Sequence, residues 1–333
     1  MGGTLFLGRH VVDVALERGH EVTLFNRGVT APGLFADVEE IHGDREHDLD
    51  LLAGRTWDAV IDTSGYVPRV VRAGAERLRE AAERYTFVSS ISVYGTYEEP
   101  GVAEDAAVPP LPEPGSEDVE RYYGELKAAC EQEVQGVFGQ RALIARPGLI
   151  VGPYDPTERF TYWVARMAEG GRVLAPGAPG QPVQLIDARD LAAWLIDRSD
   201  GGVFNLTGPA APLSFGEMLE CIRATVNPAA EIAWVDEAAL ADADVEPWSD
   251  LPLWLDVPRH PELRGFLAAD ISRALTAGLR LRPLEETIAD TLAWVRERGP
   301  GGPPLKTVGV TIPPAGLSRT RERELLVAAG ALH

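Results

Sequence analysis

Residues 2–8 read GGTLFLG, and they lead into a stretch in which Val11, Val14 and Ala15 recur at helical spacing. A glycine-rich turn at the start of a helix leaves backbone N–H groups and the positive end of the helix dipole free to bind a pyrophosphate. The run EVTLF at 21–25 follows at the distance expected of a βαβ unit. The glycine loop alone is weak evidence, but with this strand it predicts a dinucleotide-binding fold at the start of the chain.

Two features of this loop depart from the usual dinucleotide pattern. Leu5 stands at the central position of a G-x-x-G-x-x-G pattern, where a glycine lets the backbone approach the phosphates. A dinucleotide fold also has a strand before the loop, and only Met1 precedes it here. Because loss of this central strand would leave backbone groups unpaired on its neighbours, we expect the true start several codons upstream. An intact-mass measurement that finds Met1 or Gly2 at the native terminus would contradict this hypothesis.

Strand-like and helix-like segments alternate over the first 150 residues, which predicts βαβ units and a doubly wound, Rossmann-like parallel sheet. The Pro-, Gly- and acid-rich segment 100–115 is expected to be an exposed loop. The predicted strands are 21–25, 58–62, 85–89 and 142–145, and the predicted helices are 10–18, 69–84 and 117–138.

The second half of the chain has a less regular pattern. We expect 151–300 to form a smaller substrate-binding lobe, with about 183–207 returning to the Rossmann-like domain of residues 1–150. Residues 246–258 are dense in Trp and Pro, which favours a lid or a pocket wall. Residues 301–333 are expected to supply a linker and a charged terminal helix over 318–332. The other predicted elements are a strand running into a helix over 183–198, a strand at 203–207 and a helix at 215–225.

The composition excludes several classes of partner. At 45% hydrophobic residues, the 333-residue chain has ample apolar material for a core, and 31 basic against 51 acidic residues give a net charge of −20. We expect no nucleic-acid partner and no docking on anionic lipid, because both depend mainly on Lys and Arg. Two cysteines, no apolar run of membrane-spanning length and no signal-peptide pattern indicate a soluble, cytoplasmic protein.

The end of the second predicted strand bears on the choice of cofactor. Enzymes that select NAD place Asp or Glu at this point to bind the ribose 2′-hydroxyl, whereas this chain has Asn26 followed by Arg27. The missing carboxylate and the added cation favour a 2′-phosphate, and Arg9 lies beside the same loop. The sequence therefore predicts NADP as the cofactor, with NAD as the alternative. Asp44 is expected near the adenine amine.

A tyrosine and a lysine four residues apart, Tyr123 and Lys127, lie inside the predicted helix 117–138 and share one helix face. A free phenol has a pKa of about 10, so an adjacent ammonium is expected to lower the pKa of Tyr123 toward the working range of an acid–base catalyst. Ser89 and Ser90 end the strand before this helix, where hydroxyl groups face the ligand crevice of a parallel sheet. We interpret the glycine loop, the strand-end serines and the Tyr-Lys pair together as an active site.

With these motifs in this order, the chain resembles the short-chain dehydrogenase/reductase superfamily, in its extended branch of NAD-dependent epimerases and dehydratases. The resemblance implies that Ser90 holds the substrate oxygen, that Tyr123 is the acid–base, and that Lys127 activates Tyr123 and binds the nicotinamide ribose. The matching stretches are GGTLFLG (2–8), DTSG (62–65), VSSISVYG (88–95), YGELK (123–127), ARPGLIVGP (145–153), QLIDARD (184–190) and FNLT (204–207).

The resemblance also implies which residues surround the ligands. Residues 63–65 would line the cofactor and residues 147–150 would flank the nicotinamide. Tyr94, Arg146 and Tyr154 are expected to contact the substrate. The residues expected to bind the cofactor are Gly2, Thr4, Leu5, Phe6, Leu7, Gly8, Asn26, Arg27, Asp44, Thr63, Ser64, Gly65, Pro147 and Ile150.

Three functions stay open at this point. The first is NADP-dependent hydride transfer between a carbonyl and an alcohol, because RPGLIVGP is similar to the reductases of this branch and Leu149 replaces the Asn usual in sugar-nucleotide epimerases. The second is an epimerase that oxidises and re-reduces its substrate at the same residues. The third is a member that has lost catalysis and binds cofactor or RNA, which the Ser90, Tyr123 and Lys127 set and the charge of −20 oppose. The resemblance also implies pairing of two copies through the helix around Tyr123.

Other clusters have simpler explanations than chemistry. His42 and His47 lie five residues apart in an expected loop, without the helical spacing of a two-histidine metal site, so we predict no metal. Cys130 lies on the Tyr123 helix and is expected to be a core residue.

Overall fold

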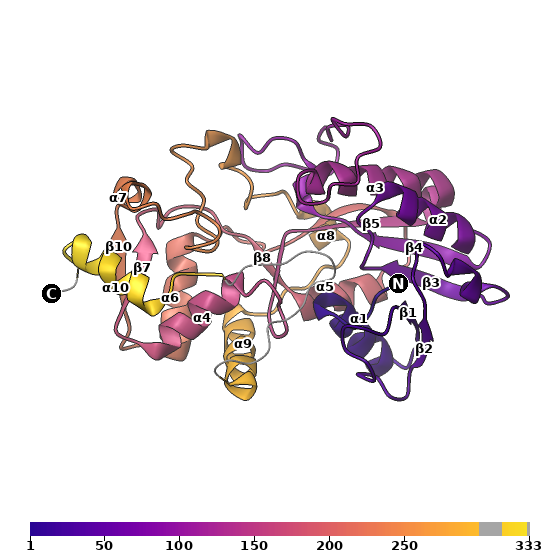
Figure 1. The fold of residues 1–333 in the computed structure, drawn as a ribbon, viewed down its shortest axis with the longest axis horizontal. Helices are drawn as coiled ribbons and strands as arrows, with labels where there is room; N and C mark the ends of the chain where they lie inside the picture. The colour runs from indigo at the N-terminus through magenta and orange to yellow at the C-terminus, as the bar shows by residue number, and fades with distance from the viewer. Residues whose placement is uncertain (300–314, 332–333) are drawn as a thin grey trace.

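The computed structural model describes residues 1–299 and 315–331, and it divides into two halves (Figure 1). The indigo-to-purple half contains the N-terminus and most of the strands. The pink-to-yellow half contains the C-terminal helices and ends at the C-terminus, at the far end of the molecule. The first half resembles a Rossmann domain in its layers, and the second half lies beside it.

The main sheet contains four parallel strands in the order β3-β4-β5-β9. Strand β4 is buried along most of its length, as expected of a strand with helices on both faces of its sheet. Strands β1 and β2 form a separate parallel pair beside β3. The strand bounds are β1 Thr23–Asn26, β2 Glu39–His42, β3 Trp57–Asp62, β4 Ala82–Val88, β5 Ala142–Pro147 and β9 Gly202–Leu206.

Helices cover both faces of this layer, so the predicted doubly wound α/β fold is confirmed. On one face, α1 (Phe6–Glu17) packs with α5 (Ala188–Asp197) through a cluster that includes Leu7, Val11 and Leu191. On the other face, α2 (Pro68–Leu78) packs with α3 (Tyr123–Phe138) through a cluster that includes Val71 and Val134. Both α5 and β9 come from the second half of the chain and lie with the first.

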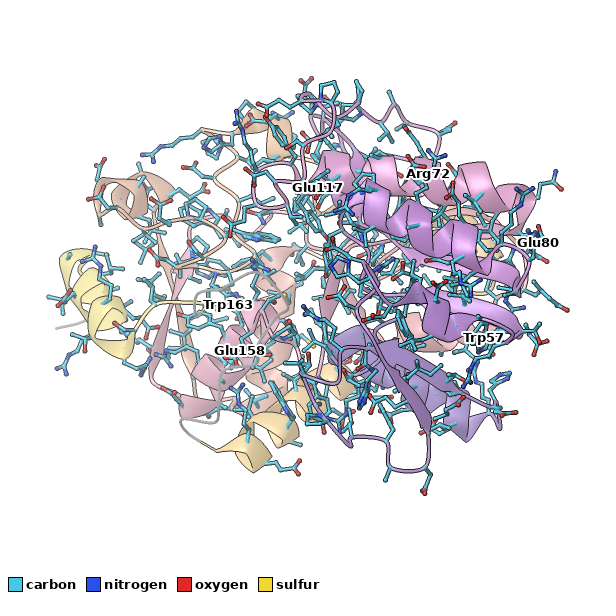
Figure 2. The ribbon with its side chains drawn as sticks, turned by 45° about the vertical axis from the view of Figure 1, so that its right-hand side comes forward. Trp57, Arg72, Glu80, Glu117, Glu158 and Trp163 are labelled. Atoms are coloured by element: carbon cyan, nitrogen blue, oxygen red, sulfur yellow. The ribbon has the colours of Figure 1, made fainter. Side chains whose placement is uncertain are left out.

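A space separates β1 from β3. In the part of the chain that the structure describes, Met1 and Gly2 supply the backbone hydrogen bonds that bridge the two strands: the Met1 amino group donates to Ile61 O at 3.0 Å, Thr63 N donates to Met1 O at 3.2 Å, and Gly2 N donates to Phe25 O at 3.0 Å. Behind this bridge lies a cavity of about 1140 Å³, lined by both strands and by Trp57, which Figure 2 labels. Within the described residues, the facing edges of β1 and β3 pair with no strand.

The second half packs around its own apolar core, in which Phe160, Trp163 and Phe215 are fully buried. Figure 2 places Trp163 inside this lobe. A box formed by Ser214 and Glu217 caps α6, as the pattern S-x-x-E predicts. The elements of this half are β6 Leu149–Val151, α4 Arg159–Glu169, β7 Arg172–Pro176, β8 Leu185–Asp187, α6 Phe215–Val226, β10 Glu231–Val235, α7 Glu237–Asp242, α8 Ser272–Thr276, α9 Leu284–Arg298 and α10 Arg319–Ala328. Strand β6 pairs with β8 and β7 pairs with β10, both parallel.

Some predicted boundaries are wrong. The helix expected over 69–84 ends at Leu78, because residues 82–88 pair with β3 on one side and β5 on the other. The helix expected from 117 begins at Tyr123, after a series of turns. Residues 246–258 form no regular element. The predicted linker lies mostly outside the described residues, as does the last residue of the predicted helix 318–332. No helix in the described parts of the chain is long and apolar enough to span a membrane.

Candidate functional site

The strand-end serines lie where α3 meets the end of β4. Ser90 caps the short 3-10 helix Ile91–Val93, accepting a hydrogen bond from Ser92 N at 3.1 Å and donating to Ser92 Oγ at 3.0 Å. Helix α3 approaches this turn so closely that a Cβ at Gly124 would collide with the Ser92 carbonyl oxygen. The glycine after Tyr123 therefore lets the helix place its tyrosine against the serines.

The Tyr123 phenol lies near enough to the Ser90 hydroxyl for that hydroxyl to lower its pKa. Tyr123 starts α3 and keeps 38% of its surface exposed, so its ring is open to a ligand. Desolvation raises the pKa of Tyr123 to about 12, Tyr66 adds to the rise, and the interaction with Ser90 opposes it. The expected fall in the pKa of Tyr123 is therefore wrong.

The position of the Lys127 ammonium explains why the pKa of Tyr123 is not lowered as expected. Its side chain is buried, and Nζ donates to Gly65 O at 2.8 Å and to Val88 O at 2.6 Å. Burial lowers the pKa of Lys127 to about 8. The ammonium is thus fixed to the backbone at the ends of β3 and β4. The helical spacing predicted that Lys127 and Tyr123 share a face of α3. It could not predict the two carbonyl oxygens, because they belong to other elements.

Tyr66 is a site residue that the sequence analysis missed. Its ring lies 6.5 Å from the Tyr123 ring between centroids, and Lys127 Nζ lies 5.1 Å from its centroid. It is 41% exposed. Its place directly after DTSG, at the end of a parallel strand, was the signal that points to it.

The glycine loop has the shape of a phosphate cradle. Gly2 and Gly3 have φ values of +90° and +101°, and a Cβ on Gly8 would lie 2.9 Å from the Gly3 backbone. Leu5 at the N-cap of α1 makes no side-chain cap, so the first N–H groups of the helix stay available to an anion. Among the described residues, the buried Nε of Arg9 also has no hydrogen-bond partner. These features fit the pyrophosphate of a dinucleotide.

A buried ion pair supports the loop from below. Arg45 donates to both oxygens of Asp62, at 2.9 and 2.8 Å, and to Ser64 Oγ at 3.3 Å. Burial opposes the ionisation of Asp62, but the Arg45 guanidinium holds the pKa of that carboxyl well below its usual range. Tyr85 adds a hydrogen bond to Asp62 at 2.8 Å. The turn at 63–65 is thereby fixed beside the glycine loop.

A carboxylate on β2, that of Glu40, lies beside the end of β1, and the sequence analysis did not consider it. Asn26 Nδ2 donates to Glu40 Oε1 at 2.9 Å and to Gly2 O at 3.4 Å, while its Oδ1 accepts from Gly28 N at 2.6 Å. Glu40 Oε2 lies 3.0 Å from His42 Nε2. Arg27 is exposed and forms no ion pair with another described residue.

The other predicted cofactor residues are distributed along the same edge of the sheet. Thr63 Oγ1 donates to Met1 O at 3.2 Å, and the Asp44 carboxylate accepts from Glu46 N at 2.9 Å, within its own turn. Pro147 ends β5 and Ile150 lies in β6. Thr4 lies in the turn that precedes α1, and Phe6 and Leu7 lie in its first turn.

The three predicted substrate residues do not come together. Tyr94 and Arg146 are buried, with Tyr94 Oη 2.9 Å from Arg146 Nη1 and the guanidinium paired to Glu131 at 2.7 Å. Tyr94 Oη also donates to Asn205 Oδ1 at 2.7 Å. Their polar groups are occupied inside the fold, which contradicts direct contact with a substrate. Tyr154 lies elsewhere, under the Arg9 guanidinium, whose Cζ is 3.7 Å from the ring centroid.

Metal ligation has no support in the described residues. No group of three His, Cys, Asp or Glu side chains in residues 1–299 and 315–331 is arranged to hold a metal ion. Cys130 is buried in the core of the first half, where burial raises the pKa of its thiol to about 12.

Comparison with known proteins agrees with this geometry. The sequence model described as "NAD dependent epimerase/dehydratase family" matches residues 66–205. A curated relative, the chloroplast stem-loop binding protein of 41 kDa b from Arabidopsis thaliana, is 28% identical over 256 residues, which cover 70% of this chain. The match covers 64% of that relative's length.

Solved structures show the same fold at low identity. The UDP-glucuronic acid 4-epimerase from Bacillus cereus, in complex with NAD, is 17% identical, with a TM-score of 0.62 over 88% of this chain and 96% of its own. The Bordetella bronchiseptica enzyme WbmH, in complex with NAD+, is 18% identical, with a TM-score of 0.61 over 88% and 96%. Residues 66–205 therefore match the model of the NAD-dependent epimerase/dehydratase family, and the chain shares the overall fold of these solved epimerase structures.

Proposed function

We propose that the chain is an NAD(P)-dependent epimerase that oxidises an alcohol of its substrate and then reduces the resulting carbonyl at the same site. The observation that carries the proposal is the close approach of the start of α3, with Tyr123, to the serine turn at the end of β4, with Lys127 one helical turn away. The family match and the NAD-bound epimerases with the same fold support it.

Each side chain has a separate task in this scheme. A nicotinamide held beside the glycine loop would supply the hydride chemistry. Ser90 orients the substrate oxygen by a hydrogen bond, and Tyr123 exchanges the proton of that oxygen. With a pKa of about 12, the Tyr123 phenol is protonated at neutral pH and can donate its proton to the carbonyl oxygen in the reducing step; in the oxidising step it acts as base after losing that proton. Lys127, with a pKa of about 8, is mostly charged at neutral pH and is the cation on the same helix face as Tyr123.

A reductase that consumes its cofactor is the second candidate. It is favoured by Leu149, which stands where sugar-nucleotide epimerases usually have Asn. The two candidates differ in the fate of the cofactor, because an epimerase returns the hydride to its substrate and accumulates no reduced nucleotide.

The first measurement is a fluorescence titration of the chain with NADH and NADPH, followed by a screen of sugar nucleotides and simple carbonyl compounds. We expect Tyr123→Phe to lower turnover by about 10²- to 10⁴-fold while nucleotide binding is retained, since only the proton transfer is removed. Tyr122→Phe is the matched control, because that hydroxyl is bonded to Glu113 at 2.7 Å, outside the site. Full turnover by Tyr123→Phe would overturn the proposal.

The choice between NAD and NADP, the binding partners and the location in the cell are predictions of this chain's properties. The exposed Arg27 supports the NADP predicted from sequence, whereas the carboxylate of Glu40 supports NAD. A small-molecule substrate, no nucleic-acid or membrane partner, pairing of two copies through α3 and a cytoplasmic location remain predictions.

A further inference from the structure

We propose that Glu40 selects NAD over NADP by placing its carboxylate where the adenosine ribose of the cofactor binds. The inference rests on the proposed cofactor binding and goes beyond it, because it assigns the choice of nucleotide to one residue. It also reverses the NADP preference that Asn26 and Arg27 suggest when the sequence is considered alone.

The position of Glu40 follows from the Asn26 side chain. Asn26 ends β1, the strand whose carboxyl end faces the adenosine ribose in a dinucleotide fold. Its Nδ2 is shared between Gly2 O, in the glycine loop, and Glu40 Oε1 on the next strand. One amide group therefore links the phosphate cradle to the carboxylate. Although Glu40 lies on β2, it reaches the place where NAD-selecting enzymes have an acidic residue at the end of the preceding strand.

The carboxylate stays ionised at this place. Hydrogen bonds with Asn26 and then His42 lower the pKa of Glu40. Its side chain is 19% exposed, so it remains accessible while it is oriented. An ionised carboxylate accepts hydrogen bonds from the ribose hydroxyls and repels a 2′-phosphate.

Arg27 does not cancel this charge. It is exposed and has no ion-pair partner among the described residues, so solvent and salt screen it strongly. Glu40, by contrast, is bonded on both oxygens, at 2.9 and 3.0 Å. We therefore expect the hydrogen-bonded Glu40 carboxylate to affect the choice of nucleotide more than the exposed Arg27 guanidinium does.

Glu40→Gln tests the assignment, because glutamine keeps an oxygen for the Asn26 hydrogen bond and loses only the charge. The readout is the ratio of the dissociation constants for NADH and NADPH, measured by fluorescence titration at fixed salt. In the unchanged chain we expect NADH to bind more tightly. In Glu40→Gln we expect the ratio to shift toward NADPH by about tenfold or more, with an unchanged melting temperature.

Glu39→Gln is the matched control. Glu39 is the preceding residue of β2, so its side chain points to the opposite face of the strand, where it pairs with Arg55 at 2.7 Å. The control variant removes one negative charge from the adjacent position of the strand. It is expected to leave the ratio of the NADH and NADPH dissociation constants unchanged. If both nucleotides bind and Glu40→Gln does not change their ratio, the assignment of Glu40 is wrong while the proposed function stands. If neither nucleotide binds, the proposed function is wrong and the assignment falls with it.

Discussion

At the residue scale, the hydrogen-bond partners of a buried polar side chain near the site come from other elements of the fold and not from its neighbours on the same helix. Lys127 lies one turn from Tyr123, yet its ammonium donates to Gly65 O and Val88 O. Helical spacing predicts which residues share a face. It cannot predict backbone acceptors that distant strands bring to that face, so the sequence predicted the shared face of Tyr123 and Lys127 and misjudged the pKa of the phenol.

Asp155 offers a direct test of buried charge. It lies in the loop between β6 and α4, fully buried, and accepts hydrogen bonds from Thr157 N at 2.8 Å and Thr157 Oγ1 at 3.0 Å. Burial raises its pKa from 3.8 to about 6. The native state therefore binds more protons than the unfolded state between these values, and this group makes the protein less stable as the pH rises from about 4 to 6.

We expect Asp155→Asn to remove this penalty and to keep the contact with Thr157 N. Its free energy of unfolding should match that of the unchanged chain near pH 4 and exceed it by about 3 kcal/mol at pH 7. Urea unfolding at both pH values measures the difference. A variant that is equally stable at pH 7 would show that folding does not raise the pKa of Asp155.

At the element scale, α10 is joined to the lobe by a buried ion pair. Arg166 on α4 donates to Glu322 on α10 at 2.7 Å, and Glu322 also accepts from Leu174 N in β7 at 3.0 Å. Both side chains are almost completely buried. The sequence predicted a charged terminal helix, but it did not predict that one glutamate of this helix would enter the core, because its partners lie about 150 residues earlier.

Glu322→Gln is expected to lower the free energy of unfolding by about 3 kcal/mol, because it leaves the Arg166 guanidinium buried without its counter-charge. Glu324→Gln on the same helix is the control, since Glu324 is 60% exposed and its pair with Arg321 is 3.5 Å long. Urea denaturation measures both. Equal stability of the two variants would mean that α10 contributes little to the lobe.

The local sequence pattern does not suffice to predict where some helices and strands begin and end. The helix 69–84 was predicted too long because Ala82 fits the helical face of Val71 and Leu78 as well as it fits a strand. Pairing with β3 and β5 decides in favour of the strand, and those partners are not local. Strand β2, at 39–42, provides Glu40 and was absent from the predicted elements. Its residues EEIH lack the apolar alternation of a half-buried strand.

At the scale of the whole molecule, the net charge of the chain bears on whether it binds nucleic acid. Its curated relative is named for binding a stem-loop, and this chain carries a net charge of −20. Phosphate contacts require Lys and Arg in excess on the binding face.

We therefore expect no retardation of a stem-loop RNA in a gel-shift experiment at physiological salt. The control is the same titration at low salt, where weak electrostatic binding is strongest. A complex at physiological salt that weakens as salt is added would contradict the expectation and would favour the RNA-binding alternative.

The space between β1 and β3 has a consequence for amide hydrogen exchange. In an unbroken sheet the amides of these strands would be central and would exchange only when the whole domain unfolds. Among the described residues their facing edges have no strand partner, and the backbone hydrogen bonds that join the two parts of the layer come from Met1 and Gly2. Deuterium should therefore enter β1 and β3 early, while β4 and β5, paired on both sides, stay protected. The part of the layer that we propose for the adenosine end of a dinucleotide is thus expected to open before the rest of it.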